Sequence, residues 1–585
     1  MSQHLPAVAP AVTAEIVGAL SPRLRKRLDA AITKIADRPV TRDGDTVRIT
    51  VDDETGLELH APAGVVTTAD AIRCGCLLAP GCLHRAAIAS AAPVADPVAH
   101  PSCDPDAGQP SPDEDAGPPQ PPEAEESTAT PEQRAAAGQL WTAGAALLDT
   151  GIEGAGAVLQ SELLRAAHTA KLAGLPRPAA AAVSVVTALR SARSADPAHR
   201  LADLTAAVLE LLGTAHRLPD ATGPELAALR GTARQTYVPD GSLRLYGLFT
   251  EPLITAGGYA GAITWTAAAD GRLYTVSDIA PGGPGRATAA AGRTVRLGDT
   301  ALTHRQLSHA GLALSGATVS PTGRLGAGAG VKAVQAAGAA WTDEPLAALW
   351  APPAAEQVAR ALNSQAPGAD LLFLDVTILG PARETGGDCL LATCGDLTLR
   401  LTAAHDHPAL AYRDNLRMLA ALPGTRLRVV GRLLPDSRPG LRLLAAAHPA
   451  DPARRVDLGL DRLQRADLPS AAPPVAQVPT GGEAGQAPLH LMRRRLEQAV
   501  AAGRPFLAVP GSSPADAGQL RRSALPTAAD LLAELQRTAT RRARDPFGRL
   551  LPADPTDFAR AWLGAALYTE AAEASLCAAA WQQER

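Results

Sequence analysis

Three cysteines and one histidine of this chain lie within residues 74–84. One residue separates Cys74 from Cys76, five residues follow, and one residue separates Cys82 from His84. Thiolates and imidazoles are common ligands of Zn²⁺, and four of them complete its tetrahedral shell. The types and the spacing of these residues therefore predict one structural zinc ion held by Cys74, Cys76, Cys82 and His84.

The chain between the ligands also fits such a site. Side chains two residues apart in an extended chain point to the same side, so the first two cysteines can reach one ion. Pro80 and Gly81 are typical of a chain reversal that returns the second pair to that ion. Four protein ligands leave no position for water, which is the pattern of structural rather than catalytic zinc. Redox-active thiols and inert cysteines are the alternative interpretations.

Short helices and strands are predicted on both sides of the ligands. Apolar residues recur at helical spacing in Ser21–Asp37, which predicts a helix. Residues 47–51 alternate between apolar and polar, and residues 57–59 return after an acidic turn, which predicts a hairpin. A further helix is expected to begin at Leu83. Residues 1–92 are therefore expected to form a small ββα zinc finger domain.

The Cys-x-Cys pair, the five-residue spacer and the Cys-x-His pair, with strands before them and a helix after them, resemble the SWIM zinc finger over roughly residues 45–92. This resemblance implies that the same four residues are the zinc ligands and that the module binds DNA or another protein. The sequence has no helicase or transposase signature beside the finger, so it is similar to the bacterial SWIM proteins. Some of these resemble proteins encoded beside MoxR-type AAA ATPases and von Willebrand A-domain proteins, which implies a role in assembly.

Changes in composition divide the rest of the chain. Residues 93–132 are acidic and Pro-rich and lack the apolar content that offsets ordering entropy, so they predict a disordered linker. Beyond them, the expected regions are helical (133–236), a small β module (237–300), helical or irregular (301–366), an OB-like β module (367–450), a linker (451–486) and a C-terminal helical region (487–585). The predicted fold class is α+β with several domains.

The OB-like prediction depends on the order of elements in residues 367–450. Three strands, a helix and two further strands are expected, which is the order of a five-stranded OB-type barrel. The expected strands and helix are Leu371–Leu379, Asp388–Thr393, Leu397–Thr402, His407–Leu422, Thr425–Leu434 and Gly440–Ala446.

The charge balance bears on the partner of this chain. The formal net charge of the 585 residues is −4, and residues 1–90 hold ten Lys or Arg and ten Asp or Glu. Surfaces that bind nucleic acid usually carry an excess of cations, so a neutral finger favours a protein partner. Nucleic-acid binding is the alternative, and the candidate contacts are Arg23, Arg25, Lys26, Arg27, Arg426, Arg428 and Arg432.

The other cysteines have simpler interpretations. One further group has the residue types of a metal site, but its two cysteines are five positions apart on a strand and therefore point to opposite faces. Small core residues are the simpler explanation for this group, which consists of Cys389, Cys394, His405 and His407. Cys103 and Cys577 are expected to be free thiols.

No recognised catalytic motif accompanies the predicted zinc site. The run Gly326–Lys332 is rich in glycine but lacks the Gly-Lys-Ser/Thr ending of a phosphate loop. The sequence has no long apolar run and no basic leader followed by one, so we expect a cytoplasmic protein without membrane contact. We expect a zinc-binding, non-enzymatic protein whose finger mediates protein interaction or assembly. An enzyme of unassigned type within residues 133–450 is a further alternative, and the oligomeric state is left open.

Overall fold

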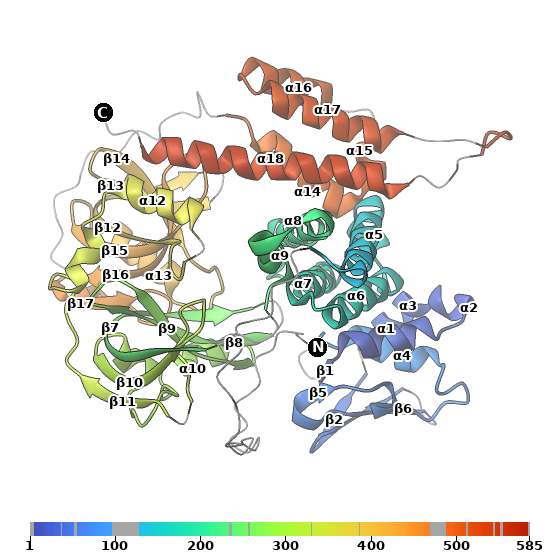
Figure 1. Cartoon of the computed structure of the whole chain (residues 1–585), viewed down its shortest axis with the longest axis horizontal. Helices are drawn as coiled ribbons and strands as arrows, with labels where there is room; N and C mark the ends of the chain where they lie inside the picture. The colour runs from blue at the N-terminus through green and yellow to red at the C-terminus, as the bar shows by residue number, and fades with distance from the viewer. Residues whose placement is uncertain are drawn as a thin grey trace. The chain divides into compact units, whose positions relative to one another are not determined.

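Two units make up the chain in the computed structural model (Figure 1). Unit 1 contains Met1–Arg234 and Pro488–Thr569, and unit 2 contains Gln235–Ala487 and Glu570–Arg585. Both units contain helices as well as strands. The predicted α+β class with several domains is therefore confirmed. The structure describes residues 5–36, 38–51, 55–95, 128–232, 237–255, 258–328, 330–364, 366–384, 387–468, 487–509, 513–541, 545–549, 551 and 554–582.

The finger region opens unit 1 with helices and a four-stranded antiparallel sheet of order β2-β3-β4-β6. Alternating side chains of β3 and β4 are buried, Val47 and Ile49 on one and Leu57 and Leu59 on the other, so the sheet packs one face into a core. The elements are β1 (Ala7–Val8), α1 (Pro10–Gly18), α2 (Pro22–Arg25), α3 (Leu28–Ala36), β2 (Val40–Asp43), β3 (Thr46–Thr50), β4 (Gly56–His60), β5 (Val65–Val66), β6 (Ile72–Cys74) and α4 (Leu83–Ala91).

The helix expected over Ser21–Asp37 is divided into α2 and α3. The side chain of Arg25 turns back toward the end of α1 and donates hydrogen bonds to the carbonyl oxygens of Leu20 (3.0 Å) and Gly18 (2.5 Å). These carbonyls lack partners inside α1, so the contact caps that helix. If α2 and α3 formed one continuous helix, Arg25 would not return to the end of α1 in this way.

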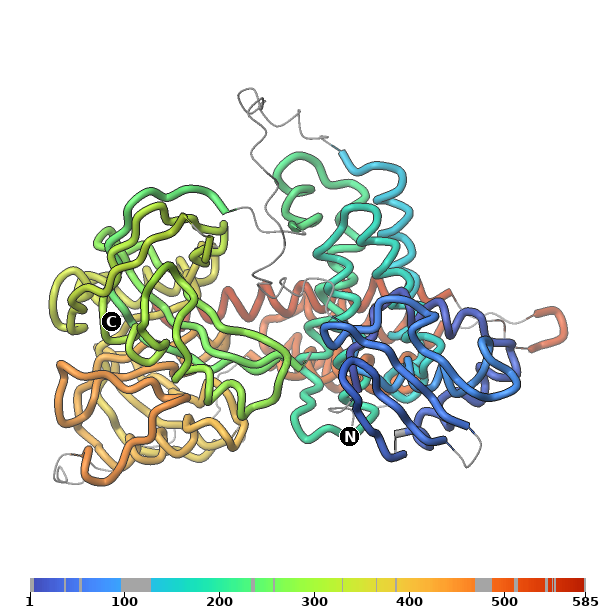
Figure 2. Tube along the Cα trace, turned by 90° about the horizontal axis from the view of Figure 1, so that it is seen from below, coloured from blue at the N-terminus to red at the C-terminus, as the bar shows by residue number. Residues whose placement is uncertain are grey.

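Helices make up the rest of unit 1, and α5 to α8 lie side by side in both views (Figures 1 and 2). A single core of leucine and alanine side chains joins residues 129–229 with residues 491–566, two regions that we expected as separate helical segments. The helices are α5 (Pro131–Gly154), α6 (Ala157–Leu172), α7 (Pro176–Arg193), α8 (Leu201–Arg217), α9 (Gly223–Arg230), α14 (His490–Ala502), α15 (Arg504–Leu507), α16 (Ser513–Arg522), α17 (Pro526–Thr540) and the first part of α18 (Pro555–Trp581).

Unit 2 contains the expected OB-like barrel, which we call the second barrel. Antiparallel pairs join β12 to β13, β13 to β14, β12 to β15 and β15 to β16, and a parallel pair between β14 and β16 closes the sheet. This is the connectivity of an OB-type barrel, with a helix between its third and fourth strands. Its elements are β12 (Leu371–Glu384), β13 (Gly387–Cys394), β14 (Leu397–Ala403), α13 (Tyr412–Ala420), β15 (Arg426–Leu433) and β16 (Gly440–His448).

A first barrel with the same strand order precedes it. The sheet order is β11-β10-β7-β8-β9, and β9 meets the segment between β10 and β11 through one isolated parallel bridge, from Thr275 to Arg324. Its elements are β7 (Val238–Ile254), β8 (Tyr259–Ala268), β9 (Leu273–Pro281), α10 (Pro284–Ala290), α11 (His304–Leu307), β10 (Gly311–Val319) and β11 (Lys332–Ala336). The short helices η5 (Leu346–Trp350) and α12 (Ala354–Asn363) connect it to the second barrel.

Two expected regions of unit 2 therefore differ from the structure. Residues 301–366, expected as helical or irregular, contain β10 and β11. The pairing of β10 with β7 and of β11 with β10 outweighs the weak strand propensity of their glycines and alanines. Residues 451–486, expected as a linker, begin with β17 (Asp451–Asp457), which pairs with β16. Asn415 of α13 then binds the backbone of Leu458, Asp461 and Leu463 and holds the chain that follows.

Most of the first predicted linker and half of the second lie outside the described residues. This is true of residues 96–127 of the acidic segment, with Cys103, and of residues 469–486 of the second segment. The last turns of α18 belong to unit 2, where Cys577 and Trp581 are buried in the core of the second barrel. The region expected as C-terminal helical, 487–585, thus contributes to the cores of both units.

Candidate metal centre

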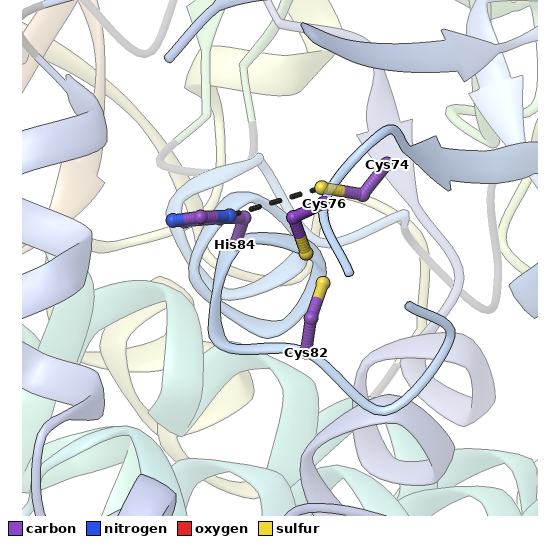
Figure 3. Close-up of side chains that lie close together, drawn as sticks. All are labelled: Cys74, Cys76, Cys82 and His84. Atoms are coloured by element: carbon purple, nitrogen blue, oxygen red, sulfur yellow. Dashed lines mark hydrogen bonds between the residues drawn. The ribbon is translucent and has the colours of Figure 1, made fainter. Parts of the chain in front are cut away.

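The four predicted ligands come together in the structure. One donor atom from each of Cys74, Cys76, Cys82 and His84 lies within 4.8 Å of all the others. Cys74 Sγ and His84 Nδ1 are 3.8 Å apart, and the sulfur atoms of Cys76 and Cys82 face each other beside them (Figure 3). Donor atoms on a tetrahedral zinc shell, at 2.0–2.3 Å from the ion, lie roughly 3.3–3.8 Å from one another. The residues present therefore fit a tetrahedral metal ion.

Three short segments carry these ligands. β6 ends at Cys74, in register with Leu57 of β4, and the backbone N–H of Gly75 donates to the carbonyl oxygen of Gly56 at 3.0 Å. A turn follows, in which the N–H of Ala79 donates to the carbonyl oxygen of Cys76 at 3.1 Å. The second pair of ligands, Cys82 and His84, comes from the start of α4, after the predicted chain reversal.

Helix α4 begins directly at the site. Cys82 is its N-cap, and the Cys82 sulfur accepts a hydrogen bond from the backbone N–H of Arg85 at 3.5 Å. The N-terminus of a helix carries partial positive charge, which stabilises a thiolate. His84 lies in the first turn of α4, where the side chains have not yet diverged around a regular helix. Because Cys82 is the N-cap and His84 lies in the first turn, these two side chains can face one ion although they are only two residues apart.

The three thiols have different environments. Burial raises the pKa of Cys74 and of Cys82. Burial also acts on Cys76, but hydrogen bonds from the backbone of Leu78 and from the other two cysteines outweigh it and lower the pKa of that thiol. If all three thiols lose their protons, the thiolates need a cation between them, because like charges at this distance repel strongly.

The other candidate ligands do not form a comparable group. Within the described residues, one group of three or more His, Cys, Asp or Glu donors lies close enough together to share an ion. This group is the cluster of Cys74, Cys76, Cys82 and His84. Cys389 and Cys394 stand on β13 and form no disulfide within the described residues, and burial raises the pKa of Cys389. Cys577 is also a free thiol, with its sulfur 3.9 Å from the carbonyl oxygen of Leu434.

Two of the three arginines of the second barrel that we considered for nucleic acid have partners inside the protein. Arg432 forms ion pairs with Glu251 and Asp370 at 2.6 and 2.8 Å. Arg428 pairs with Asp375 at 3.2 Å, and its guanidinium lies over the ring of Trp350. Both side chains thus connect parts of unit 2, and both positive charges are paired with carboxylates of the protein.

The remaining nucleic-acid candidates lie at the surface, with one exception. Arg25 caps α1, as described above. The exposed cations are Arg23, Lys26, Arg27 and Arg426. The glycine-rich run Gly326–Lys332 connects β10 to β11. A phosphate loop leads into a helix, whose N-terminus binds the phosphate, and a strand follows this run instead.

Comparison with known proteins gives little further guidance. No protein-family model matches the chain, and no curated protein matches it in sequence. Among solved structures, the chain is similar to the crystal structure of the Ifi202 HINa domain in complex with 20bp dsDNA, at 10% sequence identity. The match covers 35% of this chain and 94% of that chain, and its TM-score is 0.20. A likeness at this level establishes neither fold nor function.

The helices of the described residues include no candidate membrane span. None of them combines the length and the apolar character that crossing a bilayer requires.

Proposed function

We propose that this chain is a zinc-binding, non-enzymatic protein whose SWIM-like finger binds a protein partner. The observation that carries the proposal is the Cys74, Cys76, Cys82 and His84 cluster, whose donor atoms lie within 4.8 Å of one another. Three thiolates and one imidazole select zinc over the hard cations Mg²⁺ and Ca²⁺, which take oxygen ligands. Because protein side chains fill all four positions, the ion would hold the fold of the finger and leave no place for a reacting water.

The tip of the finger supports a protein partner over nucleic acid. Between the two ligand pairs, Leu77 is fully exposed and Leu78 is 65% exposed. The neighbouring residues Ala79, Pro80 and Gly81 are exposed as well, so the whole turn is apolar and carries no charge. Water-exposed leucines on a turn that a metal would hold rigid suit a pocket on another protein. A phosphate backbone would offer such a turn no favourable contact.

Metal quantification on the purified full-length chain tests the zinc site. We expect one zinc per chain in the wild type, and loss of that zinc in Cys82→Ser and His84→Ala. Cys389→Ser is the matched control, because it removes a free thiol outside the cluster and leaves the zinc in place. A wild-type chain prepared with zinc under reducing conditions that holds none would overturn the site.

Replacement of the leucines tests the partner. We expect a protein recovered by the wild type from native cells, and reconstituted with it from purified components, to lose affinity for Leu77→Ser/Leu78→Ser while zinc content stays unchanged. The AAA ATPase and von Willebrand A-domain proteins implied by the resemblance are the first purified candidates. Leu172→Ser is the control, because Leu172 is 76% exposed at the end of α6, away from the ligands in sequence. Equal binding by both variants would contradict a docking role for the finger tip.

Nucleic-acid binding by unit 2 is the second candidate, and the paired barrels favour it. OB-type barrels bind oligonucleotides on the face of their second and third strands and on adjacent loops. Arg426 and Arg442 are exposed cations on β15 and β16, the fourth and fifth strands of the second barrel, and Arg442 lies at the start of β16, next to the loop that joins these two strands. Binding of this kind should weaken steeply as salt rises, so a mobility-shift titration at several salt concentrations tests it. No complex with single- or double-stranded DNA or RNA at low salt would exclude this candidate.

A further inference from the structure

A buried arginine stands directly beside the ligands of the finger. Arg85 follows His84 in α4 and is only 6% exposed. Its guanidinium donates hydrogen bonds to three backbone carbonyl oxygens, those of Ile72 (2.6 Å), Pro80 (2.6 Å) and Ala69 (2.5 Å). Each of its three nitrogens thus has a backbone acceptor.

The three acceptors belong to the segments that carry the ligands. Ala69 and Ile72 lead into Cys74 at the end of β6, and Pro80 lies in the turn two residues before Cys82. Arg85 itself belongs to the first turn of α4 and donates its backbone N–H to the Cys82 sulfur. One side chain therefore ties the strand, the turn and the helix together around the cluster.

The charge of Arg85 also fits an anionic site. In the described part of the chain, no carboxylate lies within ion-pair distance, 4.0 Å, of its guanidinium. A buried cation without an anion is costly, and the carbonyl dipoles offset only part of that cost. Zinc with three thiolates and a neutral histidine has a formal charge of −1, so the occupied site would supply the missing negative charge nearby.

We infer that Arg85 is the positioning residue of this zinc site, setting the distances between its ligands by holding three carbonyl groups in a fixed arrangement. The inference rests on the proposed zinc binding. An arginine is needed because its planar guanidinium offers several donors in a rigid fork, whereas a lysine offers one ammonium group on a flexible stem. Loss of such an outer contact typically lowers the metal affinity of a site by 10- to 100-fold.

The experiment compares three variants of the full-length chain: Arg85→Met, Arg85→Lys and Arg73→Met. Zinc affinity is measured by competition with a chromophoric chelator, and the ligand field is measured from the absorption of Co²⁺ at saturation. We expect Arg85→Met to lose about 10- to 100-fold in zinc affinity and to show an altered Co²⁺ spectrum, with Arg85→Lys between it and the wild type. Arg73→Met is the matched control, because exposed Arg73 also adjoins a ligand, and it should bind as the wild type does.

The outcomes separate this inference from the zinc site itself. If the wild type binds no zinc, the proposed function fails. If the wild type binds zinc and Arg85→Met binds it equally well, with the same Co²⁺ spectrum, the role of Arg85 is wrong while the site stands. An equal loss in Arg73→Met would also contradict it, because that result assigns the effect to charge alone. If Arg85→Met does not fold, hydrogen exchange of residues 69–91 shows this, and Arg85→Lys decides the question.

Discussion

The guanidinium of Arg432 donates two hydrogen bonds to the carboxylate of Glu251, at 2.6 and 2.7 Å. Glu251 lies on β7 of the first barrel and Arg432 on β15 of the second, 181 positions apart in sequence. The same carboxylate accepts a hydrogen bond from the indole of Trp265 at 2.7 Å. Side chains of both barrels also share one apolar core, so this ion pair lies within a continuous interface.

Glu251→Gln should destabilise unit 2. The substitution leaves Arg432 partly buried without its main anion, and breaking a buried pair in this way typically costs 3–5 kcal/mol. Arg432 is one-third exposed and keeps Asp370, so we expect a smaller loss of about 2–3 kcal/mol. The measurement is hydrogen exchange of the β7 and β15 segments in the full-length chain at increasing urea. Asp388→Asn is the control, because its pair with Arg383 is almost fully exposed and should contribute nothing measurable.

The stability of unit 2 should depend on pH through two buried groups with opposite effects. Burial lowers the pKa of His304 from 6.5 to about 4, so its contribution to stability is present above pH 6.5 and is lost as the pH falls toward 4. Burial raises the pKa of Asp457 from 3.8 to about 6, so its contribution is present below pH 3.8 and is lost as the pH rises through 6. Each effect amounts to about 3 kcal/mol, and between pH 4 and 6 they largely cancel.

Asp457→Asn should reveal the histidine alone. Asparagine resembles the protonated carboxyl group, so the variant should exceed the wild type in stability at pH 7.5 and lose about 3 kcal/mol as the pH falls from 7 to 4. Urea unfolding of the β7 and β17 segments, followed by hydrogen exchange at several pH values, measures the profile. Parallel profiles for wild type and variant would show that Asp457 is charged in the folded state without cost.

Gly151→Ala should destabilise unit 1. Gly151 has φ +69°, and an added Cβ would lie 2.5 Å from the backbone nitrogen of Gly503. Positive φ and a backbone collision together should cost about 3 kcal/mol. The control is Gly138→Ala in the same helix, where nothing lies within 4 Å of the new methyl group and a gain of about 0.5–1 kcal/mol is expected. Chemical denaturation, followed by hydrogen exchange of α5 and α14, measures the stability of both variants. Similar effects of the two substitutions would contradict the close approach of Gly151 to the backbone of Gly503.

Removal of zinc should unfold the finger region locally. In small zinc sites the energy of metal binding is also folding energy, so a chelator should increase hydrogen exchange in residues 69–91, and added zinc should restore protection. The thiols must lose their protons to bind the ion, so affinity should rise with pH. Segments β8 and β9 of unit 2 serve as the internal control. Unchanged exchange in residues 69–91 after verified loss of zinc would show that hydrogen bonds such as those of Arg85 hold the finger by themselves.

Local patterns in the sequence were sufficient to predict the candidate metal ligands and the second barrel. Cys74, Cys76, Cys82 and His84 lie within eleven residues, so a single turn brings them together. The third strand of the second barrel, β14, alternates between buried and more exposed side chains, and the helix between its third and fourth strands is amphipathic. In both cases short-range spacing and periodicity contain the information.

Contacts between distant residues were decided by the tertiary structure alone. β10 and β11 have the small residues of a loop and become strands because β7 provides hydrogen-bonding partners for β10, and β10 provides them for β11. Arg432 has the sequence context of an exposed cation, but Glu251 binds it from 181 positions away. Arg85 is one arginine beside a ligand, as Arg73 is, and only the fold buries one of them against three carbonyl groups. The sequence by itself determined which residues can hold a metal, whereas pairing and burial, which depend on segments far away along the chain, decided which cations stay at the surface.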